Sequence, residues 1–532
     1  MANRNLFGST PIQVPNRSGF DLSHENMLTL KCGQLVPVMT DLLIPGDRVS
    51  VGSAFEIQLP PMATDFYGRV RFKMEAFFVP CRLLYGGWQK FMTSPTGNNA
   101  PSAIPVDSKL PYCVVPAESA SILGRGSLAD YLGYKGTVNT RQRINNIMRF
   151  MAYHKIYDDW YRDSRIQKPV FDEAVPIASS ATHISVATLP FQGPNGFSLN
   201  YGSGTKFADG VDLFSLRQRN WARDYFTNAT PLPQAGTGAS LSFDVAQDSG
   251  SFTIASLRAA NSLQQWLERN NIAGNRYADQ IKAHFGVMPA DAVTQRAIYL
   301  GSSSSVIYNH SVYQTVGVEP SVEVSPNPFS TVGSKYSAPI GSDKSSLVGD
   351  FSVTEFGYLM VIGSIVPDAV YATGINRDFF RLQIGDFAFP LLQGVGDQPI
   401  YKAELANVGV DGDTMDNMAT FGYTQRFAEY KFMEDEVHGG LCDGQSLSAF
   451  ALKRSFGKLT ETTLGSSFLE IPVDYLDDVA ASSSSLPSTF GAWADIFFQY
   501  RKTSVLSAYT IPTLGDPHNT HIETVPTGGR RL

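Results

Sequence analysis

Side chains that could hold a metal ion are few in this sequence, and they are scattered. His518 and His521 form an HNTH pair, but no cysteine or carboxylate cluster stands near them. A zinc site normally needs three or four converging ligands, so we interpret this pair as part of an exposed polar loop. The carboxylates of the segment 411–416 lack the glycine and the glutamate that complete an EF-hand loop. A solvated turn is therefore favoured there, and loose calcium binding stays open.

Motifs for nucleotide binding and catalysis are also missing. The stretch from Gly202 to Lys206 contains glycines and a lysine, yet its spacing is not that of a P-loop. The sequence has no HExxH motif, and no GxSxG motif at a strand-to-helix turn. The acidic runs 158–159 and 434–436 could supply paired carboxylates, but acidic residues are mostly exposed, and we interpret both runs as solvated surface. The sequence thus predicts no enzyme activity, no cofactor and no metal centre.

Basic and aromatic residues gather in two segments, 141–165 and 217–223. Aromatic rings beside cationic side chains can stack the bases of a single-stranded nucleic acid. The alternative is an amphipathic helix whose aromatic residues pack inward and whose arginines pair with Asp158, Asp159 and Asp163. We favour this second interpretation.

The composition excludes wholesale disorder and argues against a dedicated nucleic-acid binder. Of 532 residues, 43% are hydrophobic and 17% are charged, so a large core can form. The low charged fraction, with 34 Phe and 23 Tyr, fits either extensive contact surfaces or a larger core than average. The net charge is −7, whereas nucleic-acid-binding domains are usually basic, so any such contact must come from a local patch.

The cysteines and the N-terminal segment indicate the cellular compartment in which the protein matures. The four cysteines are far apart, with no spacing that suggests zinc or a redox pair, and we expect reduced thiols in a protein matured in a reducing cytoplasm. They are Cys32, Cys81, Cys113 and Cys442. The first residues are polar and contain prolines, without the apolar region of a secretion signal. No run approaches the ~18 apolar residues that a membrane-spanning helix needs.

Strand patterns dominate both ends of the chain. The clearest lies at 69–79, where Val70, Phe72, Met74 and Ala76 alternate with charged residues, which predicts a half-buried antiparallel strand. Other strands are expected at 28–44, 49–59, 352–366, 422–432 and 493–507. Helices are expected at 144–160, after the possible caps Asn139 and Thr140, at 254–270, and at 276–285, where Gly286 follows as a C-terminal cap.

The order of these elements predicts an all-β core with long inserted loops. Strands at both ends, with helices and irregular stretches between them, exclude a parallel βαβ succession and favour one antiparallel sandwich. We expect an arm at 1–27, a single domain at 28–516 and a tail at 517–532. The part at about 93–350 should contain most of the loops and helices, and loops this long are usually functional or disordered.

Eight segments, in the same order, resemble the major capsid proteins of microviruses, the small icosahedral single-stranded DNA phages, and most closely their gokushovirus branch. The segments span nearly the whole chain, and each is weak alone, whereas the ordered set is specific. They are FDLSHENMLTLKCGQLVPVMTDLLIPGD (20–47), FFVPCRLLYGGWQKFM (77–92), RQRINNIMRFMAYHKIYDDWYRD (141–163), RQRNWARDYFTNATPLPQ (217–234), RYADQIKAHFGV (276–287), RAIYLGSSSSVI (296–307), FGYTQRFAEYK (421–431) and SAYTIPTLGD (507–516) with the strand before it.

The resemblance implies an eight-stranded antiparallel jelly roll with long inserted loops containing several helices. It also implies that identical copies close into a small T=1 icosahedral shell around a circular single-stranded DNA genome, in a virion assembled in the cytoplasm of the bacterial host. The partners implied are a small basic DNA-packaging protein and a host cell-surface receptor. A packaging protein would explain how an acidic chain encloses DNA. The alternatives are a β-rich sandwich enzyme acting on glycans, or another virion surface protein such as a spike.

One segment departs from the family pattern. Gokushovirus capsid proteins commonly carry a long insertion after the motif that ends here at Gln234, and it forms protrusions at the three-fold axes. Only residues 235–253 occupy that place in this chain. We therefore expect either a shell with a smoother outer surface than that of gokushoviruses, or surface protrusions formed by the loop 308–349.

Both ends of the chain have too few apolar residues to fold alone, so we expect them on the inner surface of the shell or at contacts between subunits. The basic residues expected to contact the genome are Arg4, Arg17, Arg530 and Arg531.

Overall fold

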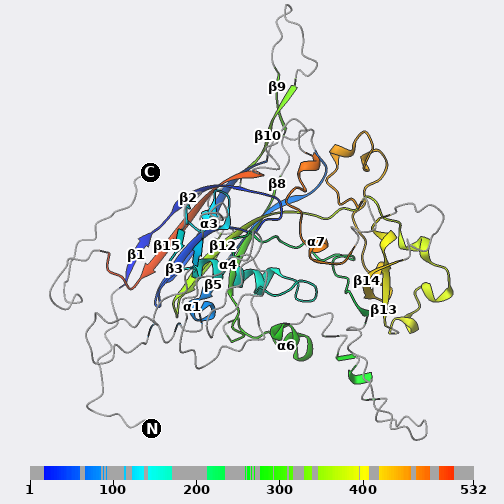
Figure 1. The fold of residues 1–532 in the computed structure, drawn as a ribbon, viewed down its shortest axis with the longest axis horizontal. Coiled ribbons are helices and arrows are strands. Elements are labelled where there is room, and N and C mark those ends of the chain that lie inside the picture. The colour runs from blue at the N-terminus through cyan, green and yellow to red at the C-terminus, as the bar shows by residue number, and fades with distance from the viewer. Residues whose placement is uncertain are drawn as a thin grey trace, which may run out of the picture.

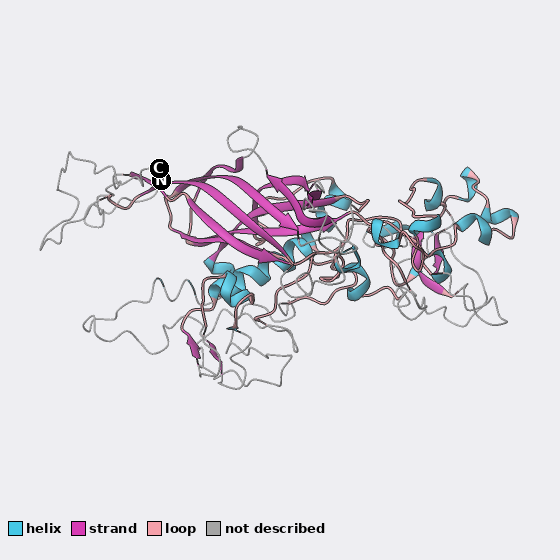
Figure 2. Cartoon of the chain, turned by 90° about the horizontal axis from the view of Figure 1, so that it is seen from above, coloured by secondary structure: helices cyan, strands magenta, loops and turns pink. Residues whose placement is uncertain are grey.

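Two antiparallel β-sheets packed face to face form the centre of the molecule, and a smaller lobe extends from one end of them (Figures 1 and 2). This confirms the expected antiparallel sandwich. The computed structural model describes residues 17–59, 66–85, 88, 92, 113–115, 123–136, 142–170, 213–233, 258, 261–263, 265–266, 269, 276–291, 293–307, 311–315, 329–337, 346–394, 396–406, 419–456, 463–479 and 491–508.

The larger sheet has seven strands, and its centre is the pair of long strands β4 and β15. These two pair from Trp493 opposite Gln58 to Thr503 opposite Arg48. The other edge of β15 is occupied by β1 and β2, one after the other, and the other edge of β4 by β10 and β11. The strands are β1 (Ser18–Asp21), β2 (His24–Leu30), β4 (Arg48–Leu59), β9 (Ser311–Thr315), β10 (Phe329–Ser337), β11 (Ser346–Ser352) and β15 (Ala492–Ser504).

The smaller sheet has four strands in the order β3-β12-β5-β8. They are β3 (Val36–Leu43), β5 (Val70–Pro80), β8 (Ile298–Ile307) and β12 (Gly357–Pro367). The alternation predicted for β5 is confirmed, because Val70, Phe72, Met74 and Ala76 are at most 1% exposed and belong to the core between the sheets. The Phe72 ring meets that of Phe55, from the larger sheet, edge to face at 4.9 Å.

The opposite face of the smaller sheet is also covered, which the alternating pattern did not predict. Every residue of β12 is buried. Leu359 and Val361 face the core of the sandwich, whereas Tyr358, Met360 and Ile362 belong to a second core on the outer face. Helical elements contribute to this second core (Figure 2); they are α1 (Cys81–Leu84), α3 (Leu128–Tyr131), α4 (Met148–Ile156) and the π-helical turn η3 (Tyr157–Tyr161). The short strands β6 (Cys113–Val115) and β7 (Gln142–Ile144) pair nearby.

Two boundaries near the N-terminus differ from the expectation. The run 28–44 is two strands rather than one, because the chain turns between β2 and β3 at Gly33. This glycine has a φ of +69°, and a Cβ there would lie 2.6 Å from the Cβ of Ile471. The sheet also begins before residue 28, since β1 and most of β2 lie within the expected arm and pair with β15.

The predicted helices have three outcomes. The helix expected at 144–160 begins later, because Ile144 lies in β7 and the side chain of Asn146 accepts the hydrogen bond from the Met148 N–H at 2.9 Å. The helix at 276–285 is confirmed as α6 (Tyr277–Phe285), and Gly286 ends it with a φ of +70°. The expected helix 254–270 lies largely outside the described residues, as do the possible caps Asn139 and Thr140.

The lateral lobe, defined as the described residues within 371–406 and 419–456, has a small core to which Ile400 and Phe421 contribute, together with Phe226 and Phe468 from outside the lobe. Its elements are η7 (Arg377–Phe380), η8 (Ile384–Asp386), η9 (Pro390–Leu392), β13 (Asp397–Tyr401), η10 (Lys402–Glu404), β14 (Thr420–Gln425), η12 (Ala428–Tyr430), η13 (Gly439–Leu441) and η14 (Ser448–Phe450). Between the lobe and β15 lie α7 (Ser466–Leu469) and η15 (Asp477–Val479). The strand expected at 422–432 is thus β14, which ends at Gln425 and gives way to η12.

The hairpin β9–β10 projects away from the sandwich (Figure 1). Within the described residues, Cys32, Cys81 and Cys442 are free thiols. None of the described helices has the length and apolar character needed to cross a membrane.

Candidate nucleic-acid and assembly surfaces

The two basic and aromatic segments of the sequence come together on the outer face of the smaller sheet. Tyr153, Tyr157 and Trp221 are all at most 4% exposed, so these rings pack inside the protein rather than offering faces to nucleic-acid bases. The Tyr153 hydroxyl donates to the Leu35 carbonyl at 2.7 Å and accepts from the Arg217 N–H at 2.8 Å. These aromatic residues therefore attach one segment to the other and to the sheet.

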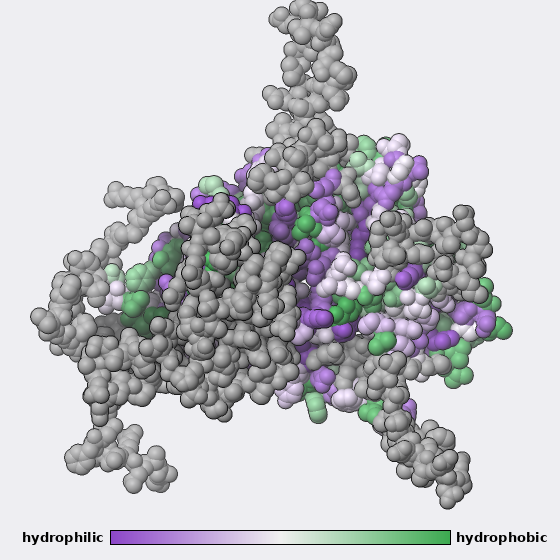
Figure 3. All heavy atoms as spheres, viewed as in Figure 1, coloured by the Kyte–Doolittle hydropathy of each residue, from purple (hydrophilic) through white to green (hydrophobic). Residues whose placement is uncertain are grey.

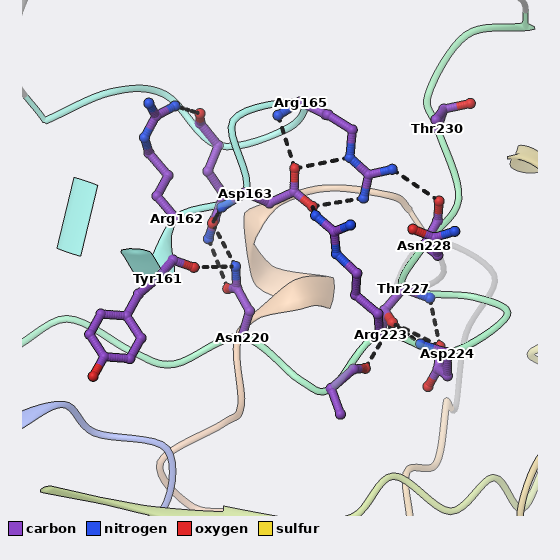
Figure 4. Close-up of polar contacts among 12 residues, drawn as sticks. Tyr161, Arg162, Asp163, Arg165, Asn220, Arg223, Asp224, Thr227, Asn228 and Thr230 are labelled. Atoms are coloured by element: carbon purple, nitrogen blue, oxygen red, sulfur yellow. Dashed lines mark hydrogen bonds and ion pairs between the residues drawn. The ribbon is translucent and has the colours of Figure 1, made fainter. Parts of the chain in front are cut away.

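Several cations of these segments are paired with Asp158, Asp159 and Asp163, as we favoured. Arg162 lies 2.5 Å from Asp158, and Lys155 lies 3.0 Å from Asp159. The carboxylate of Asp163 accepts from Arg165 at 2.8 Å, and Figure 4 shows the guanidinium of Arg223 approaching the same carboxylate, at 3.9 Å.

The interpretation of residues 158–159 as solvated surface is wrong. Asp158 and Asp159 are 5% and 7% exposed, and they accept hydrogen bonds from backbone N–H groups of Val170 and Ala297. Buried carboxylates are tolerated when they are paired and hydrogen-bonded, and both conditions hold here. The run looked like surface because the backbone donors that bind it, at Val170 and Ala297, come later in the sequence.

A largely buried ion pair connects the 213–233 segment with the charged face of β5, and its two side chains are 15% and 18% exposed. The guanidinium of Arg219 donates to both carboxylate oxygens of Glu75, at 2.7 and 3.2 Å, and the Tyr161 hydroxyl donates to the same carboxylate at 2.5 Å. Burial opposes ionisation of Glu75, but the hydrogen bonds and charge of Arg219 outweigh it and lower the pKa of the carboxyl. Glu75 is therefore charged, and its part of the charged face of β5 is an internal contact, whereas Arg69 is exposed.

A second cation, Arg454, connects the lobe with the same segment. Its guanidinium lies 4.4 Å from the ring centre of Phe468 and 4.7 Å from that of Trp221, and it donates to the Phe468 carbonyl at 2.7 Å. Cation–π contacts of this kind are strongest when they are desolvated, and Arg454 is only 7% exposed. The sequence alone did not single out Glu75 or Arg454, because their partners are far away along the chain.

The acidic run 434–436 is partly surface and partly a pocket wall. Asp435 and Glu436 are exposed, as predicted, whereas Glu434 is half-buried and accepts from the Tyr225 N–H at 2.9 Å. It lines a cavity of about 430 Å³ between the lobe and the 213–233 segment. Burial, followed by the negative charge of Asp224, raises the pKa of Glu434 to about 7. This carboxyl can change its charge near neutral pH.

The basic residues expected to contact the genome are largely outside the described part of the chain. Arg4, Arg530 and Arg531 lie there, and Arg17 is exposed immediately before β1. The segments 202–206 and 411–416 and the histidines 518 and 521 also lie outside it. Among the described residues, no three His, Cys, Asp or Glu side chains converge as a metal site would require.

Replacing Arg219 by Met is expected to destabilise the subunit by about 3–5 kcal/mol, because it leaves a buried carboxylate without its counter-charge. The double variant Glu75→Gln/Arg219→Met should recover most of that loss. The free energy of unfolding from urea titration measures both. The exposed pair of Arg48 and Asp350 is the control, and Arg48→Met should change the free energy of unfolding far less than Arg219→Met does. An equal loss in the free energy of unfolding for Arg219→Met and Arg48→Met would contradict the assignment of a largely buried pair.

The stability of the subunit should fall as the pH rises from about 4.5 to about 7 through the ionisation of Glu434. In this window the unfolded chain releases the proton while the folded chain retains it, so the proton stabilises the folded state at the acidic end. Glu434→Gln should remove this contribution, about 1 kcal/mol after allowance for solvent screening. Thermal unfolding at pH 4.5 and pH 8 measures it, with Glu56→Gln, a change at an exposed carboxyl of β4, as control. An unchanged pH dependence in Glu434→Gln would disprove the prediction.

Comparison with known proteins agrees with this picture of a structural protein. Residues 10–246 and 240–514 match the family described as capsid protein (F protein). The chain is 26% identical to capsid protein VP1 of Chlamydia phage 1, over 96% of this chain and 98% of the relative. It is 24% identical to capsid protein VP1 of Bdellovibrio phage phiMH2K, over 96% and 98% of the two chains. It is also 24% identical to capsid protein VP1 of Spiroplasma virus 4, over 94% and 95%.

These matches cover almost the entire chain, including the helix-containing segments and the lobe. They agree with the contacts described above, which hold the subunit together. The chain therefore belongs to the phage capsid protein (F protein) family, whose members are structural subunits of the virion shell.

Proposed function

We propose that copies of this capsid subunit close into a T=1 icosahedral shell around a circular single-stranded DNA genome, and that each copy contributes one eight-stranded jelly roll. The observation that carries the proposal is a family match along nearly the whole chain, combined with a two-sheet antiparallel core. Identical subunits that use different surfaces toward their neighbours form a closed shell only when their rotations close.

The order of the strands supports a jelly roll. One sheet contains β2, β15, β4 and β11 as neighbours, and the other contains β3, β12, β5 and β8. Strands near the start of the chain thus pair with strands near its end, as they do when a long hairpin is rolled into two facing sheets. On this proposal, the single domain expected at 28–516 extends back to β1, and the helices and the lobe are insertions between its strands.

The hairpin β9–β10 is the best candidate for relief on the outer face. It lies within the segment 308–349 and projects from the edge of the larger sheet, where its strand β10 pairs with β4 (Figure 1). We propose that it, rather than the short segment 235–253, provides the protrusion that a host receptor would meet.

The two ends of the described chain leave the sandwich at one place. Ser18 of β1 lies opposite Ser504 of β15, and the Ala508 N–H donates to the Ser18 hydroxyl at 3.2 Å. The basic residues at both ends therefore start from the same corner, which supports a joint role on the inner surface. Because the net charge of the chain is −7, we propose that a small basic packaging protein supplies most of the counter-charge for the DNA. Assembly in the host cytoplasm agrees with the free thiols.

Expression of the whole chain, followed by size-exclusion chromatography and negative-stain microscopy, tests the shell. The expected result is closed icosahedral particles or pentameric intermediates. A stable monomer that hydrolyses glycans would instead support the alternative of a sandwich enzyme. A fibre or a trimeric spike would support the other alternative, a different virion surface protein.

The basic ends are tested by particles in which Arg4, Arg17, Arg530 and Arg531 are all replaced by Ala. These particles should form but retain less DNA. The slope of the logarithm of the DNA-binding constant against the logarithm of the salt concentration should become shallower by roughly one for each phosphate that is no longer neutralised. The control is Arg125→Ala, which removes an exposed arginine that lies just before α3 and away from both ends of the chain. An unchanged DNA content in the fourfold variant would contradict the assignment.

A further inference from the structure

The outer edge of the lateral lobe exposes large apolar side chains to an unusual degree. Ile384, Leu391 and Met433 are 80%, 92% and 98% exposed, and Phe379 and Leu382 are almost as accessible. Figure 3 shows apolar surface at this edge, beyond the polar surface that lies nearer the sandwich. We call these five residues the apolar edge. Soluble monomers expose such residues singly, whereas a group of them marks a contact surface.

These residues are not a poorly packed core. The lobe already has a filled interior, in which Ile400, Leu405 and Phe421 are at most 6% exposed. The apolar edge lies outside this interior, on the three turns η7, η8 and η9 and on the loop after η12. Burial within the subunit therefore does not explain the choice of residues.

The backbone that carries the apolar edge is held in place by polar contacts. The Asp386 carboxylate accepts from the Leu382 N–H at 2.9 Å and from the Gln383 N–H at 2.8 Å. Arg426 donates to the Gly385 carbonyl at 2.7 Å. The turns are thus fixed with their apolar side chains outward, so little conformational entropy is lost when a partner covers them.

A buried cation supports the same surface from behind. The guanidinium of Arg381 lies 4.6 Å from the ring centre of Tyr430 and 5.5 Å from that of Phe387, and it pairs with Asp378 at 2.8 Å. Its side chain is 11% exposed, whereas that of Asp378 is 72% exposed. Protein–protein contacts typically have apolar residues at the centre and charged groups at the margin.

We propose that the apolar edge is a contact between neighbouring subunits of the shell, and that a second copy of this chain covers it. The inference rests on the proposed function, since it assigns one of the surfaces that shell closure requires. The lobe extends sideways from the sandwich (Figure 2), at the end opposite to the corner where β1 and the end of β15 lie. In a shell of identical subunits, such a lateral extension meets a neighbour through a different surface of that neighbour.

A charge placed on the apolar edge tests this contact. The double variant Leu391→Asp/Met433→Asp should fold as the wild type does, with an unchanged circular dichroism spectrum and melting temperature, because both side chains are outside the cores. Its particle yield should fall at least about tenfold, as expected when side chains at the centre of an interface are disrupted. Leu391→Met, which keeps the apolar character, should assemble normally. Normal assembly of the double variant would overturn the proposal.

Oxidation of Met433 by hydrogen peroxide gives a second test that needs no variant. In unassembled subunits this side chain should oxidise rapidly, whereas in particles its rate should fall about tenfold or more, because the rate of methionine oxidation follows exposure. The buried Met74 serves as the slow reference in both states. Equal rates for Met433 in particles and subunits would overturn the inference while leaving the shell intact. Failure of the wild type to form any particle would instead overturn the proposed function.

Discussion

Coverage of both faces of the smaller sheet is the constraint on which the rest of this structure depends. β5 presents apolar residues to the sandwich and charged residues to the other side, so the second face needs a partner that neutralises charge as well as one that excludes water. Arg219 supplies that neutralisation by pairing with Glu75. Because a buried charge without its partner is costly, the 213–233 segment and the helices beside it are bound to one position on the sheet.

The same device recurs outward from the sheet. Asp158 and Asp163 fix arginines within the π-helical turn and the residues after it, and Arg454 fixes the lobe by stacking against aromatic rings. The pairs of Asp158 and Asp163 are local in the sequence, whereas the Arg454 contact joins distant segments, and all three keep a cation away from solvent. The described parts of these segments are therefore attached to the sandwich, which suits a subunit whose contacts must recur in every copy.

The contacts between these segments and the sandwich give the subunit a defined shape, although only 17% of its residues are charged. Some of its charged groups are paired inside the subunit, as at Glu75 and Asp158, whereas large apolar side chains such as Leu391 and Met433 are exposed. Glu434 adds a carboxyl whose charge changes near neutral pH at the junction between the lobe and the 213–233 segment. On the proposed function, surfaces such as the apolar edge are buried only when subunits assemble.

The sequence by itself determined the elements whose signal is local. The alternation in β5, the helix α6 with its terminal Gly286 and the antiparallel character of the sandwich follow from periodicity and capping, which act over a few residues. Tertiary structure alone decided which charges are internal. Glu75 and Arg219 are 144 residues apart, and Asp158 looked like surface until the chain brought backbone donors to it. Distant segments provide these contacts, so no local pattern encodes them, whereas the pairing of Arg162 with Asp158 is local and was expected from the sequence.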